Sequence, residues 1–213
     1  MTGGADTRER LLQATIELLA GPGMAAVSAR GIAARAEVNQ GLVFYHFGSV
    51  TALVAQATRL STENTVMLYR AALRHAGSFG ELLAVGRRLH AEAASVGSVR
   101  VMAQLLAAGQ SDPAYADVAR QSLDLWFAEV TAAVERLLDA SPVRDLVDVA
   151  GLARAVGASF IGLELYEGVD GDGATGALDA LAQLTVLLDV LDDLSPVERR
   201  LLTARLRPPK GAR

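Results

Sequence analysis

Residues 28–47, SARGIAARAEVNQGLVFYHF, decide the fold of this chain. Ser28 can cap a short helix that ends near Arg35, and Asn39 can cap a second helix that continues to Phe47. Only residues 36–38 separate the two segments, so the chain must turn tightly between them. The spacing predicts two short helices packed across a tight turn, which is a helix-turn-helix.

Small and apolar side chains recur where the two short helices would face each other. They are Ile32, Ala33, Ala36, Val38, Val43 and Phe47. Ala33 is small enough to let the helices approach closely, and Phe47 is expected in their shared core. Gln40, Gly41, Phe44 and Tyr45 are then expected to project away from the packed face.

The rest of the chain also has apolar residues at helical spacing, and alternating strand-like runs are nearly absent. Asp6 followed by Glu9 is typical of a helix start, and Ser49 can cap a fourth helix that continues to about Arg74. We therefore predict an all-α protein with a three-helix head at residues 1–47 and a larger helical body at residues 48–213. Long helices are expected within residues 143–169 and 174–194.

Composition excludes several classes of protein. Of the 213 residues, 51% are hydrophobic and 21% are charged, which excludes a disordered chain. The net charge of −4 excludes a uniformly basic coat for nucleic acid. Because the chain has no cysteine, it has no disulfide, thiolate zinc site or cysteine nucleophile.

No targeting or membrane segment is predicted. The first ten residues carry charge but lack the apolar run of a signal peptide. The longest uncharged stretch, residues 38–58, is interrupted by several polar side chains, so it is a poor membrane span. We expect a cytoplasmic protein that does not contact a membrane.

The helix-turn-helix segment resembles the N-terminal signature of the TetR family of bacterial transcriptional regulators. The resemblance covers about residues 7–54 and is carried by Ile32, Ala33, Val38, Asn39, Gln40, Gly41, Tyr45, His46, Phe47 and Leu53. It implies a homodimer with two DNA-binding heads and an all-helical body that binds an effector. It also implies repression that a small ligand relieves.

DNA binding would place the second short helix in the major groove. Gln40 can pair with adenine through two hydrogen bonds, and the hydroxyl of Tyr45 suits a phosphate. Ser28 and Asn39 could place helix N-termini on phosphates. Arg30 is a candidate for the DNA backbone, with a solvated helix charge as the alternative. The predicted DNA-binding set is Ser28, Arg30, Asn39, Gln40, Gly41, Phe44, Tyr45 and His46, where the resemblance implies a phosphate contact for His46 and helix packing is its alternative.

The sequence departs from the family pattern at four positions. Glu37 stands where glycine is common, Asn39 where serine or threonine is common, and Phe44 where tyrosine is frequent. Val50 stands where the family usually has a lysine, which removes one phosphate contact. Charges in residues 1–50 also balance, with Arg8, Arg10, Arg30 and Arg35 against Asp6, Glu9, Glu17 and Glu37. We therefore expect a shallow dependence of DNA binding on salt.

The body carries a heptad pattern that predicts a dimer interface. Apolar residues repeat at intervals of four and three at Ala177, Leu181, Leu184, Leu188 and Leu191. Small residues on the preceding segment, which allow close helix approach, are Ala150, Ala153, Gly157 and Ala158. The alternative is that these residues pack inside one chain.

An effector pocket in the body would be apolar with a few polar groups. The candidates are Tyr69, His90, Met102, Gln104, Tyr115, Trp126, Phe127, Phe160 and Glu164. Plain core packing is the alternative for each of them.

Other motifs predict no catalysis. Residues 171–176 match GxGxxG, but a helix precedes them, so we interpret them as a loop between helices and not as a nucleotide site. His46, His75 and His90 lie in separate segments, and no catalytic triad stands out. We predict a protein that is not an enzyme and has no cofactor or metal.

The leading hypothesis is a dimeric repressor that leaves a palindromic double-stranded operator when a small effector binds. An activator, or a regulator that needs a corepressor, is the alternative of the same class. An all-α binding or adaptor module without DNA affinity is the alternative from another class.

Overall fold

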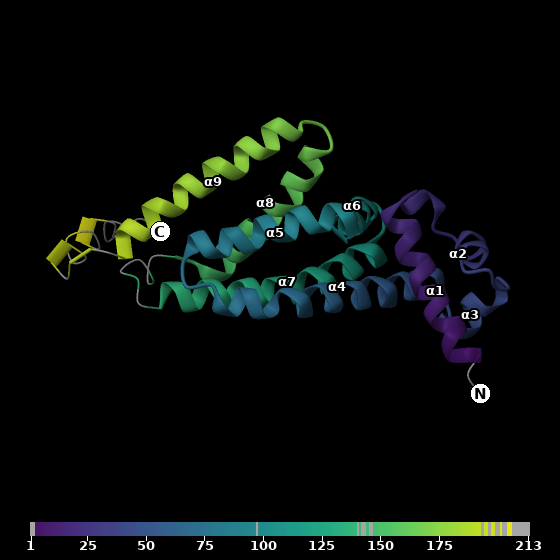
Figure 1. The fold of residues 1–213 in the computed structure, drawn as a ribbon. Helices are drawn as coiled ribbons and strands as arrows, with labels where there is room; N and C mark the ends of the chain where they lie inside the picture. Colours follow the sequence, from purple (N-terminus) through teal and green to yellow (C-terminus); the bar gives the residue numbers. More distant parts are fainter. Residues whose placement is uncertain are drawn as a thin grey trace. The chain divides into compact units, whose positions relative to one another are not determined.

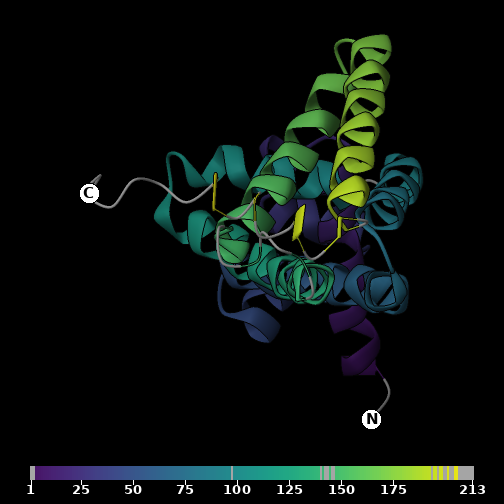
Figure 2. The ribbon, with the colours of Figure 1, turned by 90° about the vertical axis from the view of Figure 1, so that its left-hand side faces the viewer.

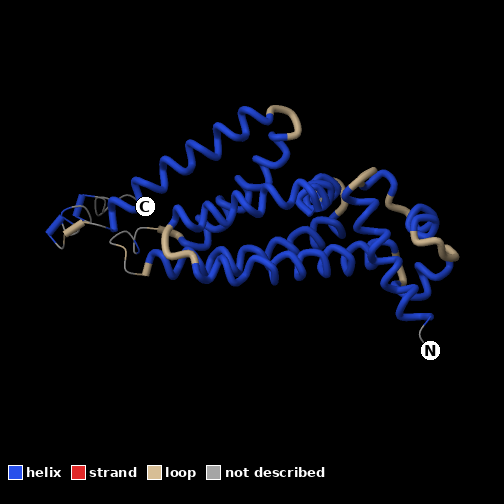
Figure 3. The backbone as a smooth tube through the Cα atoms, viewed as in Figure 1, coloured by secondary structure: helices blue, strands red, loops and turns tan. Residues whose placement is uncertain are grey.

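The computed structural model describes residues 3–96, 98–139, 141, 144, 147–192, 194–195, 197–198, 201 and 204–205. Side chains of residues 93–96, 98 and 187–192 are outside this description. In the described part every regular element is a helix, which confirms the all-α prediction (Figures 1 and 3). The elements are α1 (Gly3–Ala20), the 3-10 helix η1 (Met24–Ala26), α2 (Ala29–Arg35), α3 (Gly41–Phe47), α4 (Val50–His75), α5 (Phe79–Val96), α6 (Ser98–Gly109), α7 (Pro113–Leu138), α8 (Val149–Glu167) and α9 (Gly171–Asp192).

The chain divides into two compact units. Unit 1 comprises Met1–Leu68 and His90–Trp126, and unit 2 comprises Tyr69–Leu89 and Phe127–Arg213. Unit 1 therefore contains the predicted head together with α6 and parts of α4, α5 and α7.

One buried cluster in unit 1 joins α1, α2, α3 and the start of α4. Ile32, Val43 and Leu53 are completely buried in it, and Phe47 is 7% exposed. The cluster also contains Leu11, Leu12, Ala14, Ala29, Ala33, Ala36 and Ala57. Burial of these side chains is the main force that holds the helix-turn-helix together.

Three polar side chains cap the helices of unit 1 as the sequence predicts. The Ser28 Oγ accepts from the Gly31 N–H at 3.0 Å, at the start of α2. The Asn39 Oδ1 accepts from the Gly41 N–H at 2.8 Å, at the start of α3. Ser49 Oγ accepts from the Ala52 N–H at 3.0 Å and begins α4. Each bond satisfies a backbone donor that the helix itself cannot.

Unit 2 contains the antiparallel pair α8 and α9, joined by a short loop (Figure 2). A small core of Val134, Leu138 and Val149 connects α7 to the start of α8. The loop between α8 and α9 is held by Asp170, whose carboxylate accepts from the Tyr166 hydroxyl at 2.6 Å.

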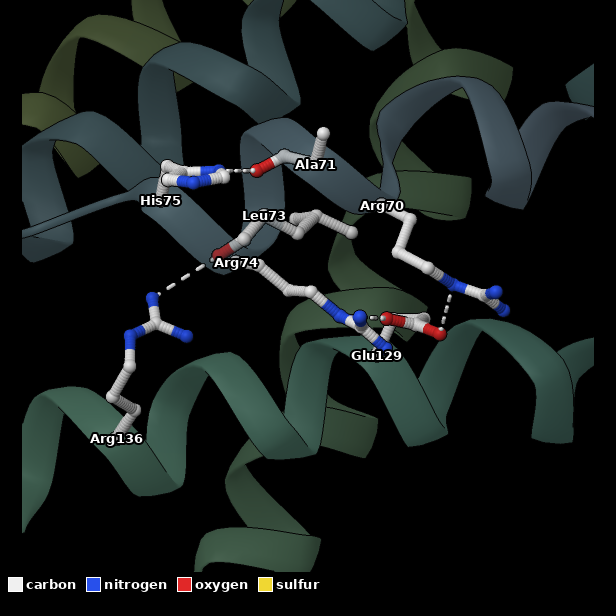
Figure 4. A network of polar contacts seen from close by, with 7 residues as sticks. All are labelled: Arg70, Ala71, Leu73, Arg74, His75, Glu129 and Arg136. Carbon is white, nitrogen blue, oxygen red and sulfur yellow. Dashed lines mark hydrogen bonds and ion pairs between the residues drawn. The ribbon is translucent and has the colours of Figure 1, made fainter.

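Polar contacts join α7 to the C-terminal end of α4 within unit 2 (Figure 4). Glu129 accepts from Arg70 Nε at 2.7 Å, and Arg74 lies 3.9 Å from its other oxygen. The Nη2 of Arg136 donates to the carbonyls of Leu73 and Ala76, at 3.1 and 2.6 Å. A cation at these carbonyls is favourable because the end of a helix carries partial negative charge.

The prediction of a loop at residues 171–176 is wrong, because α9 begins at Gly171. The Asp170 Oδ1 accepts from the Gly173 N–H at 2.9 Å, which caps the first turn. This cap, and the pairing of α9 with α8, outweigh the low helix propensity of the three glycines.

One described helix is long and apolar enough to cross a membrane, by length and composition alone. It is α8, and only 11% of its apolar window is buried within the chain.

Two buried threonines in unit 1 generate a stability prediction. Thr58 is 1% exposed, and its Oγ1 has no hydrogen-bond partner among the described residues. Thr15 is equally buried, but its hydroxyl donates to the Leu11 carbonyl at 2.7 Å. Thr58→Val should raise the free energy of unfolding by about 1 kcal/mol, because an unpaired buried hydroxyl is removed.

Thr15→Val is the matched control, since the same change removes a hydroxyl that is paired. It should give no gain in urea unfolding monitored by circular dichroism. Equal changes in the two variants would contradict the assignment of an unpaired hydroxyl to Thr58.

Candidate nucleic-acid interface

Helix α3 has one buried side and one exposed side. Val43 and Phe47 face the core of unit 1, whereas Tyr45 is 81% exposed and Phe44 is 50% exposed. Gln40 and Gly41, at the start of the helix, are also exposed. The helical period thus places four of the predicted DNA-binding residues on the solvent side of the second helix of the motif.

The side chain of Gln40 is not used by the helix that it begins. Gln40 is the N-cap residue of α3, but its side chain makes no capping hydrogen bond, because Asn39 supplies the oxygen instead. The amide of Gln40 therefore keeps a donor and an acceptor for another molecule.

His46 lies at the edge of this surface. It is half-buried, and its ring packs edge-on against Tyr45, with the two ring centroids 4.9 Å apart. Its ring centroid lies 6.3 Å from that of Phe47. His46 thus packs between the exposed and the buried aromatic ring, and its exposed part remains available to a phosphate.

Most arginines of the head are engaged within the head itself. Arg8 lies over the Phe47 ring at 5.3 Å and donates to Gln56. Arg35 pairs with Glu17 at 2.6 Å. Arg30 is exposed and has no hydrogen bond or ion pair in the part of the chain that the structure describes.

Two hydrogen bonds lower the pKa of Glu17, which pairs α1 with Arg35 of α2. A hydrogen bond from Gln13 and then one from Arg35 lower the pKa of the Glu17 carboxyl below its usual value. Glu17 therefore stays ionised at neutral pH. The Glu17 carboxylate therefore remains a partner for the Arg35 guanidinium within the head.

The turn between α2 and α3 contains a strained residue. Glu37 has a φ of +54°, in the left-handed region that glycine adopts freely. This conformation costs a non-glycine residue about 1 kcal/mol or more. Arg10 of α1 donates to the carbonyls of Ala36 and Glu37, a contact that no pattern in the sequence predicts.

The nine candidate effector residues are divided between the two units. Unit 1 contains His90, Met102, Gln104, Tyr115 and Trp126, and unit 2 contains Tyr69, Phe127, Phe160 and Glu164. Met102 and Tyr69 are buried in their respective units, at 7% and 3% exposure.

Gln104 has a structural partner in unit 1. Its Oε1 accepts from the Met24 N–H at 3.1 Å, which ties α6 to the loop between α1 and α2. Gly23, beside it, has a φ of +87°, and a Cβ there would lie 3.1 Å from the Gln104 side chain. The hydrogen bond between Met24 and Gln104 joins residues that are 80 positions apart in the chain.

The candidate dimer residues lie on different sides of their helices. Leu181 and Leu184 are exposed, at 41% and 56%, and Ala150 is exposed as well. Ala153 is completely buried, and a Cβ on Gly157 would lie 2.5 Å from the Phe127 ring. Ala153 and Gly157 thus pack within the chain. The side chains of Leu188 and Leu191 lie outside the described part.

Comparisons with known proteins assign a family to the head. Residues 11–57 match the model of the bacterial regulatory proteins of the tetR family. The HTH-type transcriptional repressor Rv3405c of Mycobacterium tuberculosis is 46% identical over 69 residues, which are 32% of this chain and 37% of that protein. A Mycobacterium bovis HTH-type transcriptional regulator, Mb3439c, matches to the same extent. The match thus spans little more than a third of the length of these curated relatives.

Solved structures extend the likeness to most of the chain. SCO7518 of Streptomyces coelicolor, a candidate transcriptional regulator, is 27% identical, and the match covers 84% of this chain and 98% of that one with a TM-score of 0.63. A Pseudomonas aeruginosa structure has a TM-score of 0.70 at 23% identity, over 94% of this chain and 93% of that one. The matched family model and these structures are described as regulatory proteins, in agreement with the prediction of a regulator. Residues 11–57 of this chain are therefore similar to the bacterial regulatory proteins of the tetR family.

Proposed function

We propose that the chain is a homodimeric transcriptional repressor that binds a palindromic DNA operator and leaves it when a small molecule binds. The observation that carries the proposal is the solvent side of α3, where the side chains of Gln40 and Tyr45 are exposed and make no hydrogen bond in the described part of the chain. The repressor Rv3405c, which matches the head, favours repression over activation.

DNA would be read mainly by neutral groups. Gln40 has the two-pronged amide that suits the N6 and N7 atoms of adenine in the major groove. Tyr45, Phe44 and Gly41 would line the same groove surface, with Ser28, Asn39 and His46 toward the phosphates. Arg30 has no hydrogen bond or ion pair in the described part of the chain, so it could contact the DNA backbone.

Dimerisation would cover the apolar side of the helix pair in unit 2. Leu181 and Leu184 on α9, with Leu165 on α8, are between 41% and 56% exposed in the single chain. Exposed apolar side chains on neighbouring helices are typical of an interface. Ala150 is available to this interface, whereas Ala153 and Gly157 would support it from within the chain.

The effector would act by a shift between two populations of the dimer. A ligand changes the spacing of the two heads only if it binds the two states unequally. The predicted effector residues of each unit remain candidates within that unit, except that Gln104 already has a structural partner in Met24. The protein is proposed to be cytoplasmic, where the operator is.

Two experiments separate this proposal from its two alternatives. Selection of duplexes from random DNA should enrich a palindrome if the chain is a dimeric operator-binding protein. No enrichment would favour an all-α adaptor without DNA affinity. An activator would bind such a site too, but transcription from it would rise when the protein is added.

Removal of the side chain of either Gln40 or Tyr45 should weaken specific binding. Gln40→Ala loses the base-reading amide, and Tyr45→Ala loses the hydroxyl and ring beside it. Each should weaken binding to the selected duplex by about tenfold to a hundredfold in fluorescence anisotropy. Gln121→Ala, an exposed glutamine on α7, is the matched control and should bind normally. Normal binding by both head variants, with normal helical content, would refute the assigned surface.

Restoring a cation at the start of α4 should steepen the salt dependence. Val50→Lys adds one phosphate contact for each head, so the log–log slope of affinity against salt should grow by about 0.9 per head, or about 1.8 for a dimer. Val50→Met adds a side chain of similar length without charge and should leave the slope as it is. An unchanged slope in the lysine variant would show that this position lies away from the phosphates.

A charge in the apolar side of α9 should separate the subunits. Leu184→Asp would place a carboxylate at the proposed interface, so the mass in sedimentation should fall from twice the chain mass of 22.3 kDa to that mass. Leu68→Asp changes a leucine on α4 that is even more exposed, at 69% against 56%, and should stay dimeric. A wild-type protein that sediments as a monomer at all concentrations would refute the dimer.

A further inference from the structure

A side chain from α1 binds the turn of the helix-turn-helix. The Nη2 of Arg10 donates to the Ala36 carbonyl at 2.5 Å and to the Glu37 carbonyl at 3.2 Å. The same nitrogen lies 3.8 Å from Oε2 of Glu37. One guanidinium therefore contacts two successive carbonyls of the turn and the carboxylate between the two helices.

The turn needs such a partner because of its backbone conformation. Glu37 is the non-glycine residue with a positive φ in the described part of the chain. A left-handed conformation is unfavourable for an L residue and persists where the surroundings hold it. The Ala36 and Glu37 carbonyls follow the last turn of α2, where partial negative charge attracts a cation.

Arg10 is well placed to hold this turn. The next residues of α1, Leu11 and Leu12, are buried in the core of unit 1, which fixes the helix that carries Arg10. The Arg10 side chain and Glu37 line one surface groove together with Glu17 and Arg35. The Glu17–Arg35 pair also joins α1 to α2 but donates to neither turn carbonyl, so it provides a matched comparison.

We propose that Arg10 is a positioning residue for DNA recognition. It stabilises the left-handed conformation of Glu37 and so fixes the direction in which α3 leaves the turn. The proposal rests on the proposed DNA-binding function, because α3 is the element that it positions. Arg10 itself touches no DNA in this scheme.

A double-mutant cycle tests the proposal. Arg10→Met keeps the aliphatic stem but loses the donors, and Glu37→Gly removes the need for them. Binding to a duplex selected from random DNA is measured at a temperature where circular dichroism shows every variant folded. Arg10→Met should bind about tenfold more weakly, and the double variant should return to within about threefold of Glu37→Gly.

Two comparisons separate positioning from other roles. Arg35→Met breaks the other pair between α1 and α2, and Glu37→Gly should bring no recovery in that background. If Arg10 were a phosphate contact, Arg10→Met would lower the log–log salt slope by about 0.9 per head, whereas positioning leaves the slope unchanged. Wild-type affinity in Arg10→Met, failure of the rescue, or a lowered slope would overturn the proposal.

The same variants distinguish this proposal from the proposed function. If the wild-type chain selects no duplex, DNA binding fails, and the cycle is read from the midpoint of thermal unfolding instead. Glu37→Gly should then raise the midpoint more in the Arg10→Met background than in the wild type. Equal shifts in the two backgrounds would show that Arg10 does not hold the turn.

Discussion

The close approach of α2 and α3 across a turn of a few residues is the constraint on which the head depends. Ala33 and Ala36 are buried at this contact, and larger side chains there would push the helices apart. Helix α2 ends with Glu37 in the left-handed conformation, and the Val38 N–H donates back to the Ala33 carbonyl at 3.0 Å. The same geometry directs Val43 and Phe47 inward and leaves Tyr45 in solvent. Packing and recognition are therefore two consequences of one short turn.

Most arginines of the head are used in contacts within the head. Its basic and acidic side chains balance, and Arg8, Arg10 and Arg35 are engaged in contacts within the head. Because these arginines are already engaged, the head has few cations left to contact DNA phosphates. The proposed recognition must therefore depend on fit in the major groove more than on counterion release. The net charge of −4 averages this neutral head with a more acidic body and does not argue against DNA binding.

The sequence predicts those parts of the fold that depend on near neighbours. Ser28, Asn39 and Ser49 cap helices as expected, because capping needs only a side-chain oxygen two or three residues from the donor. The start of α9 was not predictable in this way, since three glycines predict a loop when their pairing with α8 is unknown. The roles of Gln104 and Arg10 were also missed, because their partners lie 80 and about 26 residues away in the chain.

The sequence of helix α8 does not show which side of the helix is buried. Apolar residues occur on all its sides, so spacing could not tell that Ala153 faces the chain and Val156 faces solvent. The same composition makes the helix long and apolar enough for a membrane. Arg154, Glu164 and Glu167 argue against that reading, because each charge within a bilayer costs about 2.5 to 3.5 kcal/mol at the centre. In the proposed dimer the second copy covers the exposed Leu165. An apolar helix that is little buried in one chain is thus better explained by a second copy of the chain than by lipid.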